Sequence, residues 1–348
     1  MTTAPAPARA DSRLRAYSQF VVAVLYFFLA QIVARRGAAG LASGPWVPLA
    51  TQAMLVFLLL VGYAAMGFWF NGQLHPVSRQ GFPLRPGWPR EAGIGLAVGW
   101  AVALACVLPV VLIGGIAIVL SLVPSAWGWL AADAAFFALF ALAEEIAFRG
   151  YAFQRLVHSV GPLGASLGFA AYYAIVQSLL PGSTRASFAV SVALALLLAA
   201  AYLRTKALWL SWSLNFGFRA SRALVFGLAV AGIDDKSPVV QGNPMGPFWV
   251  TGGGFGLDGT WITLAVLLLA IPVVFRVTRD LDFRYNAPVI EPAGIPVDLD
   301  AAARAQHEAA IGPAQPAQPS LVQIAPALAA APDSDPEPVP ANRAPDSQ

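Results

Sequence analysis

Eight long apolar stretches make up most of the chain, and polar or charged residues gather between them. A helix needs about 20 consecutive apolar residues to cross the hydrocarbon core of a bilayer. The pattern therefore predicts an all-α fold, a polytopic membrane bundle of about eight transmembrane helices. The predicted spans are Tyr17 to Ala34, Trp46 to Phe70, Ala92 to Leu120, Trp129 to Phe148, Pro162 to Leu180, Ala186 to Leu203, Leu208 to Gly232 and Thr260 to Val277.

Two of these stretches need interpretation. The third is long and contains Pro109, so we expect a kink or a short extra segment within it. The first follows several arginines, as the apolar part of a signal peptide does, but it is longer than such a part usually is. We therefore expect the first stretch to remain in the chain as an uncleaved span.

Composition narrows the class of protein. The chain is 58% hydrophobic and 11% charged, against roughly 25% charged residues in soluble domains. This excludes an ordinary soluble enzyme, and the lack of a basic stripe with interleaved aromatic residues excludes a nucleic-acid partner. The one cysteine, Cys106, excludes an intrachain disulfide and a cysteine-rich metal site. The three histidines, His75, His158 and His307, lie far apart in the sequence.

Lysine and arginine are distributed unevenly over the predicted loops. In the eight-span arrangement one side holds 13 of them and the other side holds 4. The positive-inside rule then predicts a multi-pass protein of the inner (plasma) membrane with both termini in the cytoplasm. The basic side carries Arg9, Arg13, Arg15, Arg79, Arg85, Arg90, Arg149, Arg155, Arg204, Lys206, Arg276, Arg279 and Arg284, and the opposite side carries Arg35, Arg36, Arg185 and Lys236.

We divide the chain into four parts. Residues 1–16 are a cytoplasmic N-terminal tail, residues 17–84 are two helices with a basic loop, and residues 85–284 are the main membrane domain. The last part, 285–348, is rich in Ala and Pro and holds 8 of the 18 carboxylates. Such a segment buries too little apolar surface to offset its ordering entropy, so it is predicted to be a disordered cytoplasmic tail.

Ionisable side chains at membrane depth are costly to bury, so each is a functional candidate. Glu144 and Glu145 are adjacent near the end of the fourth span, and Arg149 follows Glu145 by four residues. Glu145 and Arg149 can pair on one helix face, which leaves Glu144 about 100° away around the helix. The alternative is a plain helix end whose carboxylates are held by Arg149 and the backbone. The candidates are Asp133, Glu144, Glu145, Arg149, Arg219 and Arg222.

The seventh span carries a polar stripe on an apolar helix. Asn215, Arg219 and Arg222 follow one another at helical spacing, so the stripe should face the interior of the bundle. Gln177 stands alone as a strongly polar residue in the middle of the fifth span. We expect these groups to converge with the two glutamates on one buried polar cluster.

The segment Glu144 to Gly150 reads E-E-I-A-F-R-G and resembles the first motif, E-E-x-x-x-R, of the CPBP intramembrane proteases. These include the type II CAAX prenyl endopeptidases and bacteriocin-immunity relatives. The resemblance extends over about residues 85–275 and includes the glycine run Thr251 to Gly256. It implies peptide-bond hydrolysis by a glutamate-activated water, in the processing of CAAX-box or bacteriocin-type proteins. The site residues that it implies are Glu144, Glu145, Arg149, Gln177, Asn215 and Arg219.

The chain departs from this family at its motif histidines. The second motif, F-x-x-x-H, corresponds to Tyr173 to Gln177, and the third, H-x-x-x-N, corresponds to Asn215 to Arg219. A glutamine cannot take up a proton or serve as an imidazole ligand. We therefore expect no cofactor, including the zinc or other divalent metal that is argued over for the family. An arginine at position 219 predicts a salt bridge with Glu144 across the former active site.

Three functions remain open on these grounds. The chain is an intramembrane endopeptidase that works with amide and guanidinium donors, or an inactive homologue that binds a membrane-embedded peptide or protein in the bilayer. A proton-coupled or small-solute transporter with a relay of Glu144, Arg219 and Asp133 is the third, although no internal repeat supports it. The G-x-x-x-G pairs at Gly95 and Gly99 and at Gly164 and Gly168 permit close helix packing within the chain or between copies.

Overall fold

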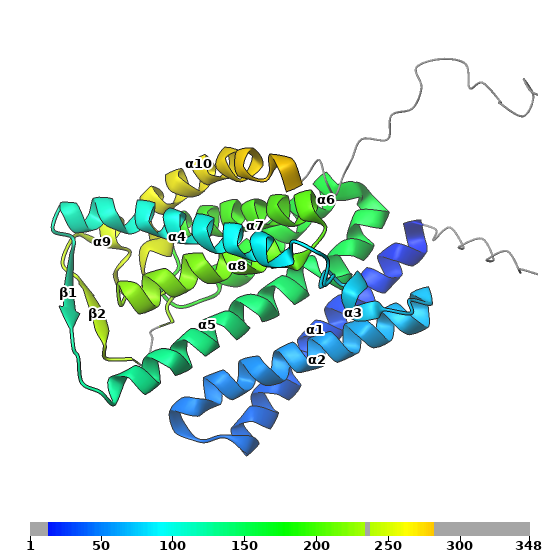
Figure 1. Cartoon of the computed structure of the whole chain (residues 1–348), viewed down its shortest axis with the longest axis horizontal. Helices are drawn as coiled ribbons and strands as arrows, with labels where there is room; N and C mark the ends of the chain where they lie inside the picture. Colours follow the sequence, from blue (N-terminus) through cyan, green and yellow to red (C-terminus); the bar gives the residue numbers. More distant parts are fainter. Residues whose placement is uncertain (1–12, 234–236, 282–348) are drawn as a thin grey trace, which may run out of the picture. The chain divides into compact units, whose positions relative to one another are not determined.

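Long helices dominate the structure, a computed structural model that describes residues 13–233 and 237–281 (Figure 1). The tail expected at 285–348 and most of that at 1–16 lie outside the described residues. The helices are α1 (Arg13–Leu41), α2 (Val47–Asn71), α3 (Pro76–Arg79), α4 (Trp88–Leu112), α5 (Ala126–Arg149), α6 (Tyr151–Ser178), α7 (Arg185–Thr205), α8 (Leu208–Ala220), α9 (Phe248–Thr251) and α10 (Trp261–Val277). Shorter elements are the strands β1 (Ile116–Leu120) and β2 (Val240–Pro244) and the helical turns Gly44–Trp46, Ser221–Val225, Gly253–Phe255 and Leu257–Gly259.

The prediction of an all-α membrane bundle is confirmed, because each predicted apolar stretch corresponds to one long helix. Five helical stretches of the described chain are long and apolar enough to cross a membrane. One of them, Ala126–Ser178, contains both α5 and α6, whereas α8 has 13 residues and α10 has 17. The count of eight spans therefore stays a prediction.

Two predicted spans are wrong in their extent. α4 ends at Leu112, and Gly114, with a φ of 75°, leads the chain into β1, so the end of the third stretch is a strand. This strand, which pairs antiparallel with β2, is the extra segment expected there. α8 ends at Ala220 and passes into a π-helical turn and then a loop. In both places apolar residues continue past the helix end, so hydropathy alone gives no boundary.

α5 lies between two groups of helices (Figure 1). On one side, α2 packs on α5, and α1 packs on α2 and α6. On the other side, α8 packs on α5, α4 and α7, and α10 packs on α7. Each group encloses its own apolar cluster, one that includes Phe27 and Phe148 and another that includes Leu197 and Leu214.

The contact between α4 and α8 depends on two glycines. A methyl group on Gly99 would overlap the Leu214 carbonyl, and one on Gly95 would overlap the Leu210 carbonyl and the Ser213 hydroxyl. The first G-x-x-x-G pair therefore serves packing within the chain. This close contact fixes the helix that carries Asn215 and Arg219.

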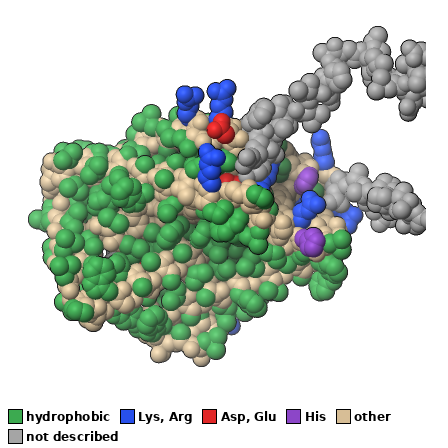
Figure 2. All heavy atoms as spheres, in the orientation of Figure 1, with side chains coloured by type: hydrophobic (Ala, Val, Ile, Leu, Met, Phe, Trp, Pro, Cys, Tyr) green, Lys and Arg blue, Asp and Glu red, His purple; other side chains and the backbone are tan. Residues whose placement is uncertain are grey.

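Hydrophobic side chains cover most of the face drawn in Figure 2, as expected for a surface in contact with lipid. Most of the basic side chains visible in this view gather toward the end where α1 begins and α10 finishes. Large apolar side chains such as Leu25 on α1 and Leu269 on α10 are well exposed, at 63% and 69%. This distribution is that of an integral membrane protein.

Candidate active site

The paired glutamates lie in the last turns of α5. Gly150 has non-helical backbone angles and separates α5 from α6, so the motif sits at a helix junction. Arg149 Nη1 donates to Glu145 Oε1 at 3.1 Å, and Arg149 Nη2 donates to the Ala195 carbonyl of α7 at 3.1 Å. The predicted pairing of Glu145 with Arg149 is thus confirmed, and it ties the end of α5 to α7.

Helix α6 contributes Tyr173 and Gln177, which lie one turn apart. The chain breaks its helical geometry at Gly161, whose φ is 83°, and Pro162 then begins the second half of α6. Gln177 Nε2 donates to the Tyr173 hydroxyl at 3.1 Å, a bond within one helix rather than between helices. Gln177 therefore reaches the cluster through Tyr173.

Helix α8 contributes Asn215 and Arg219, also one turn apart and both buried. Arg219 Nε donates to Asn215 Oδ1 at 2.9 Å, which orients the amide so that its Nδ2 faces α5. Asn215 Nδ2 then donates to Glu144 Oε2 at 3.0 Å and to Glu145 Oε1 at 3.2 Å. The two glutamates are therefore bridged by one side-chain amide.

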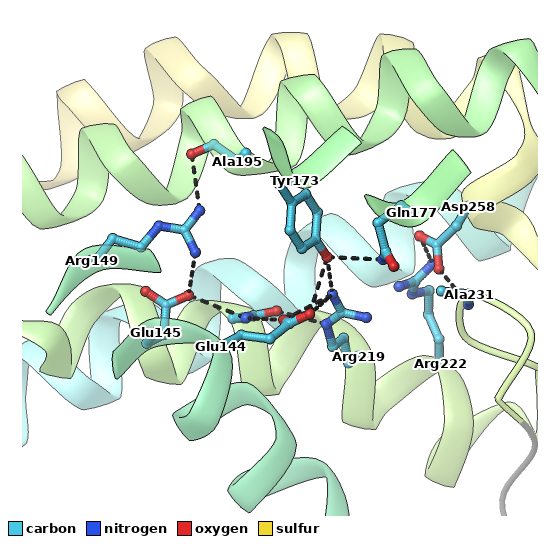
Figure 3. Close-up of polar contacts among 11 residues, drawn as sticks. Glu144, Glu145, Arg149, Tyr173, Gln177, Ala195, Arg219, Arg222, Ala231 and Asp258 are labelled. Carbon is cyan, nitrogen blue, oxygen red and sulfur yellow. Dashed lines mark hydrogen bonds and ion pairs between the residues drawn. The ribbon is translucent and has the colours of Figure 1, made fainter. Parts of the chain in front are cut away.

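Glu144 is the centre of the cluster (Figure 3). Arg219 Nη2 lies 3.0 Å from Glu144 Oε2 and 3.2 Å from Oε1, which forms the salt bridge predicted across the site. The Tyr173 hydroxyl donates to Glu144 Oε1 at 3.2 Å and accepts from Arg219 Nη2 at 2.6 Å. The predicted convergence of Glu144, Gln177, Asn215 and Arg219 is confirmed.

Sequence reasoning missed Tyr173 as a member of the site. Its position one turn before Gln177 puts both side chains on the same helix face, and that spacing was the available signal. The role of each residue in the site stays a prediction, because hydrogen bonds show proximity and not chemistry.

Arg222 does not join this cluster, so the prediction that it would is wrong. It lies in the π-helical turn after α8, and its Nη1 donates to Asp258 Oδ1 at 2.7 Å (Figure 3). Asp258 follows the glycine run, and its Oδ2 accepts the Ala231 backbone N–H at 3.0 Å. Because a buried arginine needs a counter-ion, the sequence could have predicted an acidic partner for Arg222.

The glycine run supports a tight turn at Ala231 and Gly232. Ala231 has a φ of 50°, which only glycine adopts without strain, and its N–H is held by Asp258. A methyl group on Gly256 would overlap the Ala229 carbonyl, so the run must be glycine here to approach the turn. The glycine run thus has a packing role.

A cavity of about 890 Å³ opens beside the cluster, between α1, α2, α5, α6 and the turn at Ala231. Glu144, Tyr173 and Gln177 line it on the side of α5 and α6. The Phe140 ring, which also lines it, covers the Arg219 guanidinium at 5.1 Å. The side chain of Glu144 is 14% exposed and that of Arg219 is 2% exposed, so Glu144 is the charged group of the pair that the cavity reaches.

The donor set around Glu144 does not fit a divalent metal ion. Both carboxylate oxygens face cationic or N–H and O–H donors, which a metal would have to displace. Gln177 and Asn215, which replace the motif histidines, carry amides, and Arg219, which replaces the motif asparagine, carries a guanidinium. Both kinds of group are poor metal ligands. Within the described residues, no group of three or more His, Cys, Asp or Glu side chains could hold a metal ion.

Asp133 lies away from the cluster. It is eleven residues before Glu144, which is about 16 Å along α5. Asp133 Oδ2 accepts the Ser237 backbone N–H at 2.7 Å, and the residue lines a smaller cavity of about 350 Å³. A relay from Asp133 to Glu144 would have to bridge this distance.

Comparison with known proteins identifies the part of the chain that carries the cluster. The model of the type II CAAX prenyl endopeptidase Rce1-like family matches residues 107–221, a shorter region than the resemblance in the sequence covers. No curated protein and no solved structure gives a match. The matched region contains Glu144, Gln177, Asn215 and Arg219 and excludes α1, α2 and Asp258. Residues 107–221 are therefore similar to the type II CAAX prenyl endopeptidase Rce1-like family, and the chain is an integral membrane protein that resembles these endopeptidases over this region.

Proposed function

We propose that this chain binds an apolar peptide or protein segment within the membrane and does not cut it. The observation that carries this proposal is the hydrogen bonding of Glu144. Its two oxygens accept four contacts, from Tyr173, Asn215 and twice from Arg219. A carboxylate has about four lone-pair sites, and the two contacts from Arg219 share one nitrogen, so these three donors occupy most of the sites that a nucleophilic water would need.

Loss of the imidazole partner supports the same proposal. A general base works when it can accept a proton from a water within hydrogen-bond reach. Gln177 cannot share that proton, and the Arg219 guanidinium pairs with both oxygens of Glu144. The cluster is therefore suited to holding the ends of α5, α6 and α8 together.

The cavity supports the binding part of the proposal. Most of its lining is apolar or aromatic, including Phe28, Phe136 and Phe148, with polar groups at separated positions. Ligand sites typically combine such a lining with few oriented polar groups. The partner is then a membrane-embedded peptide or protein, and the protein needs no metal.

A second candidate, a slow endopeptidase, is favoured by the exposure of Glu144 to the cavity. Tyr173, Asn215 and Arg219 are all donors, so a tetrahedral oxyanion would find hydrogen bonds if a substrate displaced one of them from Glu144. This candidate requires Arg219 to move, because the resting contacts occupy the carboxylate.

The test uses the full chain in lipid nanodiscs with photo-cross-linking prenylated and hydrophobic peptides. We expect cross-linking without fragments, and equal cross-linking in Glu144→Gln, which keeps the shape of the side chain. The exposed Asp280→Asn serves as the matched control for one lost carboxylate. Fragments that form with the native chain and vanish in Glu144→Gln would establish the endopeptidase instead. If no peptide cross-links to the native chain above empty nanodiscs, the binding function is wrong.

We place the protein in the inner (plasma) membrane with both termini in the cytoplasm. The end where α1 begins and α10 finishes is the basic one, and basic loops stay in the cytoplasm. Glu144 lies near the cytoplasmic end of α5 in this orientation, whereas Arg35, Val47 and Ile233 line the cavity toward the opposite face of the membrane. A partner would therefore enter the cavity from the bilayer or from that opposite face.

A further inference from the structure

The cavity has a second polar wall, opposite the Glu144 cluster. Helices α1 and α2 supply Gln31, Arg35, Thr51 and Gln52 to its lining. These helices lie outside the region that matches the endopeptidase family. The second wall is thus a feature of this chain that the family resemblance does not explain.

Arg35 gives this wall a positive charge. Its side chain is exposed and lines the cavity, and Gln31 precedes it by one helical turn on the same face of α1. Within residues 13–233 and 237–281, Arg35 has neither an ion pair nor a hydrogen-bond partner. An unpaired guanidinium at the edge of an apolar cavity selects for a ligand with an anionic group.

The remaining polar groups of the wall are neutral and favour a peptide over a lipid. In the described part of the chain the amides of Gln31 and Gln52 have no hydrogen-bond partner. An acyl chain in the cavity would leave such amides unsatisfied, whereas the N–H and C=O groups of a peptide can bond to them.

The spacing of the two walls sets the length of the ligand. Phe27 of α1 packs on Phe148, one turn beyond Glu144, with ring centroids 6.0 Å apart. Arg35 is eight residues further along α1, which is about 12 Å of helix. Glu144 lies one turn, about 6 Å, before Phe148, and α1 runs in the opposite direction to α5 (Figure 1). The levels of Glu144 and Arg35 therefore differ by about 6 Å, which is about two residues of an extended chain.

We propose that Arg35 binds a carboxylate of an apolar peptide whose extended backbone lies between the two walls and bonds to Gln31 and Gln52. This inference rests on the proposed function, because it names the ligand of the same cavity. The carboxylate is either the free C-terminus or an acidic side chain about two residues from the level of Glu144.

The test compares three fluorescent peptides in nanodiscs that contain the full chain. The first is Leu-Val-Ala-Leu with a free C-terminus, the second is the same peptide with a C-terminal amide, and the third is Leu-Val-Ala-Glu with a C-terminal amide. We expect at least one acidic peptide to bind about tenfold more tightly than the neutral amide. The variant Arg35→Ala should remove this preference. The variant Arg36→Ala changes a neighbouring exposed arginine that does not line the cavity, and it should retain the preference.

The outcomes separate this inference from the proposed function. If the acidic and neutral peptides bind equally, the role of Arg35 is wrong and the binding function stands. An equal loss in Arg35→Ala and Arg36→Ala would reduce the effect to general surface charge and also overturn the inference. If none of the peptides binds while palmitate does, the cavity is a lipid site and both proposals fail. Thermal unfolding of each variant in detergent checks that the exposed substitutions leave the fold intact.

Discussion

Arg219 determines what Glu144 can do. It is 2% exposed at its side chain and contacts the glutamate, Asn215 and Tyr173 at once. A buried ion pair is held in place mainly because removal of one partner leaves the other charge uncompensated. We therefore expect Arg219 to act first as a stabilising residue.

This expectation can be measured by a double-mutant cycle. Replacement Arg219→Met should lower the free energy of unfolding by about 3–5 kcal/mol, because the Glu144 carboxylate, which is only 14% exposed, loses its cation. The double variant Glu144→Gln with Arg219→Met should recover a large part of the loss. Unfolding in detergent gives the values, and the exposed Arg276→Met is the control for loss of one arginine. A double variant no more stable than the single one would contradict the role of the ion pair.

The site was predictable from sequence where short-range geometry decides it. The bond between Glu145 and Arg149 follows from their four-residue spacing. The salt bridge from Arg219 to Glu144 follows from the family register, because that register aligns two helices that lie far apart in sequence. The partner of Arg222 did not follow, since Asp258 lies in a loop whose path depends on tertiary packing.

The turn at Ala231 depends on this same acid. Asp258 is 7% exposed and neutralises Arg222, which is 1% exposed. In Asp258→Ala the arginine would stay buried as an unpaired cation, at a cost of about 3–5 kcal/mol in unfolding free energy. The turn that lines the cavity should also loosen and weaken peptide binding. The exposed Asp280→Ala should change neither stability nor binding, and similar behaviour of the two variants would contradict the prediction.

At the scale of elements, the glycine contact between α4 and α8 gives a matched pair of substitutions. Gly99→Ala puts a methyl group against the Leu214 carbonyl, and overpacking of this kind costs about 1–3 kcal/mol. Gly93 lies in the same helix with open space around its Cβ position, so Gly93→Ala should be neutral or stabilising by up to about 1 kcal/mol. Equal thermal stability of the two variants would show that α4 and α8 do not pack as described.

Restoring the family's residues tests whether these helices still form a competent site. We expect that Gln177→His combined with Asn215→His and Arg219→Asn cleaves hydrophobic peptides that the native chain leaves intact. The physical reason is that Glu144 regains a free lone pair and an imidazole partner. Fragment analysis by mass spectrometry measures the change, with Glu144→Gln added to the triple variant as the control. A folded triple variant without cleavage would mean that more than the side chains of the cluster has changed.

For the whole molecule, hydropathy located every long helix and misplaced two helix ends. The errors fall at residues 113–120, where Gly114 redirects the chain into β1, and at residues 221–232, where α8 unwinds. Strand pairing with β2 and the pair of Arg222 with Asp258 decide these two regions, and both involve partners more than 30 residues away. The hydrophobic pattern within a short stretch of sequence does not contain information about such distant partners.

The orientation of the molecule makes a prediction at the same scale. Because Cys106 is buried and is the one cysteine of the chain, single cysteines can be introduced in a Cys106→Ala background. A membrane-impermeant maleimide applied to intact cells should label Arg185→Cys, and it should label Lys206→Cys after permeabilisation. The reverse pattern would place the basic end outside and contradict the cytoplasmic termini.

The glycine contact between α4 and α8 positions the helix that carries the site, whereas the side chains of the site determine its chemistry. Close backbone packing of α4 on α8 places positions 215 and 219, and the polar cluster then ties α8 to α5 and α6. A helix bundle whose backbone packing places the site can lose hydrolytic activity through a few side-chain substitutions and still keep its binding cavity. Such a bundle gives protein engineers a membrane-embedded cavity in which new reactive side chains can be introduced at known positions.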